Sequence, residues 1–381
     1  MRQRTQYGLF VYLVCAGFAA WAGPAQAGET LMEKAAAAPN PPYWLKEGYT
    51  GGVFYFRQNH DYYEPMLADI RLPVHTLRYY RAVAVPFTQA SKLSLHNFAD
   101  VTFGETFHLF GRDYAQKAAA GGPTLVQGWA AFLEGSAHML LDFNAPSRDV
   151  INTDYRFGAG LSGRGLPGGF GPPWDRRLSW KLKYFHESTH LGDEYSIAAE
   201  KKLLSGDPAF AGFRRINVSY EAAELFLALD DLTPRKDPGL EYKRIYGGYR
   251  RLNDPGYATD DPPPLTTRIN NNEFQAGGEL YVRWTDSVGL NPARKGFFFR
   301  PQFFILATDA YKREQYDYRG DLKHPADWSF NTLAGVMYGD PFIGENTLRY
   351  FLNYYTGLNP HGQFRNGKIH YVGFNIAFDF K

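Results

Sequence analysis

Apolar and polar residues alternate with a period of two along much of this chain. Over residues 370–380, valine, isoleucine and phenylalanine recur at every second position, while the residues between them are mostly small or polar. Residues 274–284 and 129–141 alternate in the same way. Successive side chains of a strand point to opposite faces, so each segment predicts a β-strand with one apolar face. Segment 129–141 is long enough to cross a bilayer at a tilt.

Similar segments continue through the chain and bring the expected number of strands to about twelve. They lie near residues 78–90, 101–112, 153–163, 177–190, 217–230, 241–252, 296–310, 327–339 and 346–358. Most are far longer than the roughly five or six residues of an average globular strand. The pattern therefore predicts an all-β fold, a transmembrane antiparallel β-barrel of about twelve strands with a short irregular N-terminal periplasmic segment.

A soluble β-sandwich is the alternative fold, because its strands alternate as well. Two features favour the barrel. The first is the length of the expected strands, which exceeds the roughly five or six residues of an average globular strand. The final strand also ends in aromatic residues, Phe378 and Phe380, as the assembly signals of outer-membrane barrels do. The barrel assembly machinery is therefore an expected partner.

The N-terminus has the pattern of a cleavable signal peptide. Two arginines precede an apolar stretch, and residues 25–27 (AQA) match the small-x-small cleavage pattern. Residues 1–27 are therefore assigned to the signal peptide, 28–77 to the periplasmic N-terminal segment and 78–381 to the barrel. This organisation predicts the outer membrane of a Gram-negative bacterium as the location.

Composition and charge exclude several kinds of protein. The only cysteine, Cys15, lies in the predicted signal, so no disulfide is expected in the mature chain. Removing Arg2 and Arg4 lowers Lys+Arg from 41 to 39, which equals the 39 Asp+Glu. Nucleic acid is not an expected partner, because its binding needs a basic face. No mature segment approaches the roughly 20 apolar residues of a membrane helix.

Residues 186–190 read HESTH, which matches the H-E-x-x-H pattern of zinc proteases. On a helix, His186 and His190 would share one face and bind zinc, and Glu187 would act as the base. Residues 178–185, however, alternate with a period of two directly before the motif, which favours a strand. A zinc-dependent protease is therefore only a remote alternative.

On a strand, His186, Ser188 and His190 would share one face, which the preceding alternation predicts to be lipid-facing. The α-carbons of His186 and Ser188 would be about 6.6 Å apart, so the imidazole could take the hydroxyl proton. Glu221, on the outward face of the next strand together with Ser219, would lie beside His186. The candidate catalytic residues are Ser188 as nucleophile, His186 as base and Glu221 as the acid that orients His186. His190 is a secondary candidate.

This H-x-S pair resembles the pair of outer-membrane phospholipase A and the lipid A 3-O-deacylase, barrels in which it faces lipid. The resemblance implies hydrolysis of an acyl ester of a phospholipid or of lipid A. The phospholipase has an asparagine in the orienting place and uses calcium at its oxyanion site. The nearest residues of suitable type here are Asn217, Asp193 and Glu194. The resemblance therefore implies calcium as the cofactor to test, with Asp193 and Glu194 as its candidate ligands.

Two longer segments resemble a family of exported bacterial proteins. PMLADIRLP at 65–73 and HESTHLGDEY at 186–195 are similar to the most recognisable segments of domain-of-unknown-function family 1207, although Ile70 stands where that family usually has proline. The resemblance covers most of the mature chain. It implies an outer-membrane barrel and no established reaction.

Two classes of function remain open. In one, the barrel is structural or a narrow channel, and His186 and His190 belong to a polar-aromatic girdle. In the other, it is a lipid-facing Ser/His hydrolase. Residues expected to point into the lumen in either case are Lys181, Lys183, Glu279, Arg283, Arg349 and Asn353. Outer-membrane lipids and lipopolysaccharide are expected partners, with a homodimer as an alternative to a monomer.

Overall fold

The computed structural model describes residues 52–57, 62–84, 96–114, 127–144, 148–165, 177–207, 216–232, 240–259, 272–283, 301–313, 327–338, 346–364 and 368–379. Its strands are β1 (Gly52–Arg57), β2 (His75–Ala84), β3 (His96–Asp113), β4 (Gly128–Asp142), β5 (Val150–Arg164), β6 (Leu178–Leu191), β7 (Ile216–Leu232), β8 (Leu240–Thr259), β9 (Asn272–Arg283), β10 (Phe303–Arg313), β11 (Asp327–Tyr338), β12 (Thr347–Leu358) and β13 (Lys368–Asp379). The helix α3 (Asp193–Leu204) and the 3-10 turn η7 (Gly362–Phe364) lie between strands. Within the ranges given, no helix is long and apolar enough to span a bilayer. The predicted signal peptide lies outside the described residues and stays a prediction.

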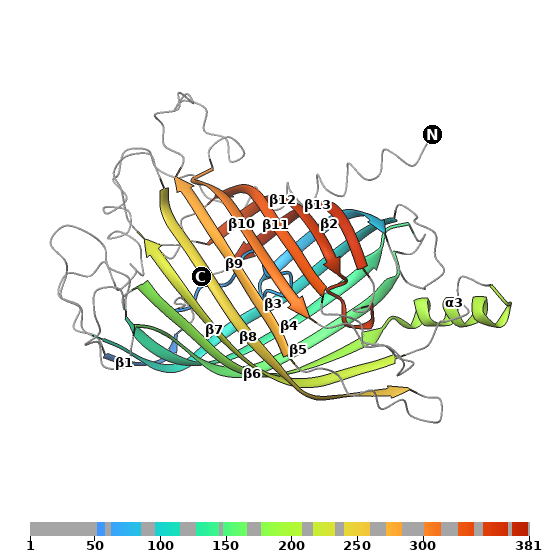
Figure 1. Cartoon of the computed structure of the whole chain (residues 1–381), viewed down its shortest axis with the longest axis horizontal. Coiled ribbons are helices and arrows are strands. Elements are labelled where there is room, and N and C mark those ends of the chain that lie inside the picture. The colour runs from blue at the N-terminus through green and yellow to red at the C-terminus, as the bar shows by residue number, and fades with distance from the viewer. Residues whose placement is uncertain are drawn as a thin grey trace, which may run out of the picture.

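The strands close into an antiparallel barrel (Figure 1). Each strand from β2 to β12 pairs with the next one, and β13 closes the ring by pairing with β2, where Ile376 lies opposite Leu77. β1 is an additional strand beside the end of β3, with Gly52 opposite Asp113. The described strands therefore form a twelve-stranded barrel, β2 to β13, with one extra strand. The predicted barrel of about twelve strands is confirmed.

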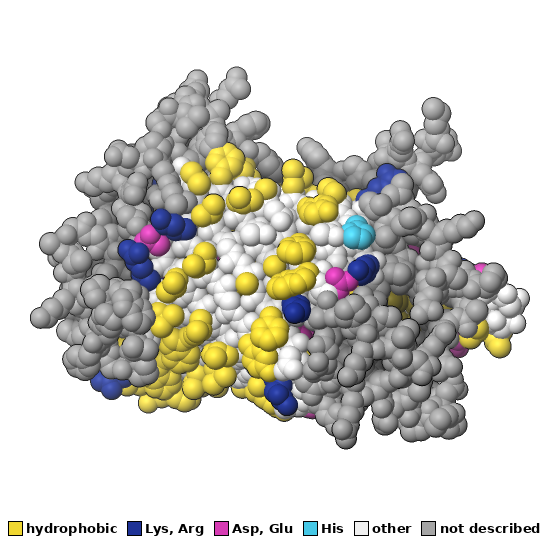
Figure 2. Space-filling view, in the orientation of Figure 1, with side chains coloured by type: hydrophobic (Ala, Val, Ile, Leu, Met, Phe, Trp, Pro, Cys, Tyr) yellow, Lys and Arg dark blue, Asp and Glu magenta, His cyan; other side chains and the backbone are white. Residues whose placement is uncertain are grey.

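The outer wall of the barrel is apolar across its middle. Large apolar side chains such as Leu182, Leu227, Phe330 and Leu352 are exposed at alternate positions of the strands. Figure 2 shows such side chains over the middle of one face, with charged side chains toward its two sides. Soluble monomers rarely expose so much contiguous apolar surface, whereas the membrane-facing wall of a barrel requires it. The fold is that of a transmembrane β-barrel.

The apolar wall predicts the effect of a charge placed in it. Leu227 is 48% exposed and lies in an outward line with Leu225 and Leu229 on β7. We expect Leu227→Arg to destabilise the barrel in lipid vesicles by about 2–4 kcal/mol, the cost of a cation near the bilayer midplane. The measurement is the urea midpoint of unfolding, with Leu227→Ala as the control. Equal midpoints for the two variants would contradict lipid exposure at this position.

Ion pairs fill the lumen. Lys183 contacts Glu134 and, at 2.9 Å, Glu224, which also contacts Arg250 at 2.8 Å. The residues predicted to point into the lumen do so. Four of them are buried: Lys183, Glu279, Arg349 and Asn353. Lys181 pairs with the buried Glu134, and Arg283 stacks on the buried ring of Phe303. Burial of a charge costs little where an opposite charge lies beside it, as it does for Lys183, Glu134 and Glu224.

Residues 62–74 cross the inside of the barrel before the chain enters β2. The Leu67 backbone N–H donates to Glu279 of β9 at 2.7 Å, and the Asn331 side chain of β11 donates to the Ala68 carbonyl oxygen at 2.7 Å. Arg71 donates to Glu187 of β6, also at 2.7 Å. A segment that contacts strands on different sides of a closed barrel lies in its lumen.

This placement revises the predicted boundary between the N-terminal segment and the barrel. The wall begins with β2 at His75 rather than at residue 78, and residues 62–74 are inside the barrel rather than in the periplasm. The sequence could not show this, because the segment has no alternation and its partners are far away in the chain. Residues 28–51 lie outside the described residues, so their periplasmic location stays a prediction.

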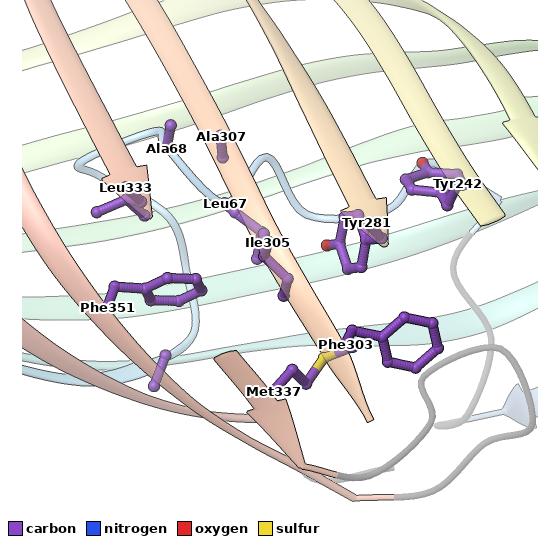
Figure 3. Packing of buried hydrophobic residues seen from close by; sticks show 11 residues of the cluster. Leu67, Ala68, Tyr242, Tyr281, Phe303, Ile305, Ala307, Leu333, Met337 and Phe351 are labelled. Carbon is purple, nitrogen blue, oxygen red and sulfur yellow. The ribbon is translucent and has the colours of Figure 1, made fainter. Parts of the chain in front are cut away.

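An apolar cluster holds part of this segment against the wall (Figure 3). Leu67 and Ala68 lie among buried side chains of consecutive strands, including Tyr281 of β9, Ile305 of β10 and Leu333 of β11. Burying a leucine contributes roughly 1.5–3 kcal/mol. The cluster and the hydrogen bonds together fix the segment in the lumen.

Candidate functional site

The HESTH motif lies on β6, and its side chains alternate between the two faces of the wall. His186 and His190 are exposed on the outside, whereas Glu187 and Thr189 are buried in the lumen. Ser188 lies between the two histidines on the outer face. The predicted strand and the predicted outward direction of His186 and Ser188 agree with the structure.

The neighbouring strand β7 supplies the rest of the site. In the register of β6 with β7, His186 lies opposite Glu221, and Ser188 lies opposite Ser219. The side chains of His186 and Glu221 are 48% and 47% exposed, respectively. The predicted pairing of Glu221 with His186 is therefore present in the structure, on the outer wall.

One histidine connects an acid to a serine. His186 Nδ1 lies 3.2 Å from Glu221 Oε1, and His186 Nε2 lies 3.4 Å from Ser219 Oγ. Because a carboxylate only accepts, Nδ1–H is the donor of the hydrogen bond to Glu221. In the tautomer with the proton on Nδ1, Nε2 accepts from the Ser219 hydroxyl. This is the connectivity of an acid, a base and a nucleophile.

Ser188 has a different partner from the one predicted. Its Oγ lies 2.9 Å from His190 Nε2, so its hydrogen bond goes to the second histidine of the motif rather than to His186. The His190 ring also contacts Tyr155 of β5 edge-to-face, with centroids 5.8 Å apart. The structure thus brings together His186 and Glu221, as predicted, and separately joins Ser188 to His190.

Ser219 is the residue of this site that the sequence did not select. Its alternation with Glu221 already placed it on the outer face. The choice between two serines near His186, however, depends on a diagonal contact between strands, and that contact follows from side-chain orientation in the paired strands. The sequence contains no signal for it beyond the shared face.

The site lies at the edge of the apolar band. On β6, the outward residue before His186 is Tyr184, which is 51% exposed. On β7, Leu225 is exposed two outward positions from Glu221. Phe157 of β5, opposite His186, is 61% exposed. Apolar side chains thus border the polar cluster, as expected where acyl chains meet head groups.

The geometry overturns the zinc-protease interpretation of HESTH. That interpretation requires both histidines and the glutamate on a helix, but these residues lie on β6. His186 and His190 point out of the barrel, whereas Glu187 points into it and pairs with Arg71 and Arg156. The strand therefore separates the proposed base from the proposed ligands by the thickness of the wall.

The residues predicted to bind calcium lie beyond the end of β6. Asp193 is the exposed first residue of α3, and the side chains of Glu194 and Asn217 are outside the described ones. Among the residues described, no group of three or more His, Cys, Asp or Glu side chains is placed to hold a metal ion. A calcium requirement stays a prediction.

A closed antiparallel barrel with an apolar outer wall defines a transmembrane β-barrel, here with an outward-facing Ser/His/Glu cluster. The chain belongs to the family described as Protein of unknown function (DUF1207), whose model matches residues 54–380. The resemblance read from the two sequence segments is thereby confirmed. No curated protein sequence matches the chain.

Solved structures of similar shape include outer-membrane enzymes. Outer membrane phospholipase A from Escherichia coli is 10% identical, with a TM-score of 0.41 over 81% of this chain and 93% of that chain. The Salmonella typhi outer membrane phospholipase dimer with bound calcium is 10% identical, with a TM-score of 0.40 over 81% and 91% of the two chains. LpxR from Salmonella typhimurium is 11% identical, with a TM-score of 0.33 over 80% and 100%.

Proposed function

We propose that this protein is an acyl-ester hydrolase of the outer membrane whose site lies on the lipid-facing wall. The observation that supports it is the chain of contacts from Glu221 through His186 to Ser219. A histidine held by a carboxylate at one nitrogen and facing a hydroxyl at the other can activate that hydroxyl as a nucleophile.

In the proposed reaction, Ser219 Oγ attacks the carbonyl carbon of the ester while its proton passes to His186 Nε2. Glu221 accepts the hydrogen bond from Nδ1, which orients the ring and stabilises its cationic form. His186 then gives the proton to the leaving alcohol oxygen as the carbon–oxygen bond breaks. Water attacks the acyl-serine with His186 as base, which releases the fatty acid and restores the hydroxyl.

Ser188 remains the alternative nucleophile. Its Oγ contacts His190 Nε2, and it lies opposite Ser219 in the strand register. In this alternative, His190 is the base, or Ser188 turns toward His186. The Glu221–His186 contact favours Ser219, because it supplies the acid that holds the base in place.

The proposed substrate is an acyl ester of a phospholipid or of lipid A. The site opens outward and is bordered by Tyr184 and Phe157, so an ester reaches it from the surrounding lipid rather than from the lumen. Contact with lipopolysaccharide, a homodimer and use of the barrel assembly machinery are further proposals for this chain.

The competing function is a structural barrel or a narrow channel. Residues 62–74 and the ion pairs of Lys183, Glu134 and Glu224 occupy the lumen. A channel would therefore require displacement of the N-terminal segment. This filling favours the structural barrel over the channel as the second candidate.

Acyl release from outer-membrane lipids by the refolded protein tests the proposal. We expect the wild type to release fatty acid and His186→Ala to lose about 10²–10⁴ of the rate, the usual contribution of a general base. The same assay in calcium and in EDTA shows whether a metal ion is needed, because a rate that EDTA abolishes and calcium restores would indicate one. A folded, heat-modifiable wild-type barrel that releases no fatty acid would assign the protein to the structural class instead.

A further inference from the structure

We propose that Arg71, in the lumenal segment, is a positioning residue for the site on the opposite face of the wall. The inference rests on the proposed function and adds a residue that contacts neither the substrate nor the reacting atoms. It assigns the lumenal segment the task of holding β6 and β7 in the relative position that the outer site needs.

Arg71 binds the two strands and a loop at once. Its Nη1 donates to Glu187 Oε1 at 2.7 Å and Oε2 at 3.0 Å, and to the Tyr220 hydroxyl at 3.2 Å. Its Nε donates to the Pro360 carbonyl oxygen, in the loop between β12 and β13, at 3.1 Å. The guanidinium thus joins the wall formed by β6 and β7 to the loop that contains Pro360.

The two wall residues that Arg71 binds are sequence neighbours of the residues of the outer site. Glu187 lies between His186 and Ser188 on β6, and Tyr220 lies between Ser219 and Glu221 on β7. Glu187 and Tyr220 are also partners in the strand register. Side chains alternate across a strand. The contacts of Arg71 with Glu187 and Tyr220, called the clamp below, therefore fix the backbone that carries the outer pairs.

The pairing of β7 with β8 is irregular beside Tyr220. Ser219 lies opposite Gly256 and Glu221 opposite Asn253, so β8 has one extra residue where β7 has only Tyr220. A bulge leaves a residue out of the regular ladder, so β8 gives β7 an irregular support at this position. On the other side β7 stays in register with β6, and the Arg71 contact with the Tyr220 hydroxyl holds this residue from the lumen.

Electrostatics keep the clamp in place. Arg71, Arg156 and Glu187 are all buried, and Glu187 accepts from both arginines. Arg71 is cationic, since a guanidinium keeps its proton in a protein, and the Glu187 carboxylate lies beside it. Without Arg71, Glu187 still has Arg156 at 2.6 Å. Loss of Arg71 therefore removes the clamp without leaving Glu187 unpaired.

The test compares Arg71→Ala with Arg313→Ala in the refolded full-length barrel. Arg313 also donates to a carbonyl of the loop between β12 and β13, that of Asn359, but it lies on β10, which β8 and β9 separate from β7. Arg71→Lys is a second variant, since lysine keeps the charge but lacks the fork that binds several groups.

Two readouts separate positioning from general stability. The first is the ¹⁵N spectrum of the His186 ring, assigned with His186→Gln, which reports the Nδ1 and Nε2 environments without any turnover. We expect Arg71→Ala to shift these signals and Arg313→Ala to leave them unchanged, with Arg71→Lys in between. The second is the rate of acyl release, for which we expect Arg71→Ala to lower kcat about 10²-fold with KM little changed, as a misplaced catalytic group does.

Unchanged His186 ring signals in Arg71→Ala would overturn the inference, as would equal shifts in Arg313→Ala. If Arg71→Ala does not refold, the same criteria apply to Arg71→Lys. The two readouts also distinguish the two proposals. A wild type that releases no fatty acid would contradict the proposed hydrolase. The ring spectrum would still show whether Arg71 positions His186, because it requires no turnover.

Discussion

Replacing Ser219 by alanine is expected to lower kcat for acyl-ester hydrolysis about 10³-fold or more, as the loss of a catalytic nucleophile does. Ser219 is the hydroxyl that faces His186 Nε2, at 3.4 Å, while Glu221 holds Nδ1. Without this oxygen no acyl-serine forms at that position. The measurement is the rate of fatty-acid release by the refolded barrel from mixed lipid micelles.

Ser188→Ala is the matched control, because Ser188 lies directly opposite Ser219 on the same outer face. Its hydroxyl contacts His190, so we expect its loss to reduce the rate by less than about tenfold. A fluorophosphonate probe should label the wild type and Ser188→Ala, and it should fail to label Ser219→Ala. The reverse pattern would identify Ser188 as the nucleophile and would contradict the role given to Ser219.

Asp230→Asn is expected to destabilise the barrel by about 3–5 kcal/mol, the cost of breaking a buried charge network. Asp230 is 1% exposed on β7 and lies 2.6 Å from Arg164 and 3.2 Å from Arg244. It also accepts hydrogen bonds from Ser179 at 2.7 Å and Tyr242 at 3.0 Å. The neutral variant leaves two buried guanidinium groups without their shared carboxylate. The urea midpoint of the refolded protein measures the loss.

The adjacent residue gives a matched control for this prediction. Asp231 lies on the same strand but faces outward, with its side chain 24% exposed, 3.5 Å from Lys243 and 3.7 Å from Arg177. Exposed ion pairs contribute about 0–1 kcal/mol, so Asp231→Asn should change the midpoint little. Equal effects of the two substitutions would show that Asp230 is not in a buried network.

The outward position of the candidate site is a local property of the sequence. Alternation with a period of two placed His186 and Ser188 on one face of β6, and the same pattern placed Glu221 and Ser219 on one face of β7. The hairpin order of the strands then brought Glu221 beside His186. The contact of Ser219 with His186, and of Ser188 with His190, depends on side-chain directions in the paired strands, which alternation does not specify.

On the inner face of the wall, the sequence predicted which residues point into the lumen but not which partners they contact. Lys183 and Glu279 were expected in the lumen because they alternate with lipid-facing residues, and both are buried there. Their partners were not predictable, since Lys183 meets Glu134 on β4 and Glu224 on β7, while Glu279 accepts from the Leu67 backbone. Such pairs join residues far apart in sequence and depend on barrel closure. The same holds for Arg71, whose segment has no periodic pattern.

By itself, the sequence determined the class of fold, the approximate number of strands and the face of each strand that meets lipid. It could do so because a strand buries or exposes alternate residues, and this constraint acts on every strand separately. Tertiary structure alone decided that residues 62–74 occupy the lumen, that Glu187 is held by Arg71 and Arg156, and that Ser219 faces His186. Those contacts exist only after the barrel has closed and brought distant strands and the N-terminal segment to within hydrogen-bonding distance.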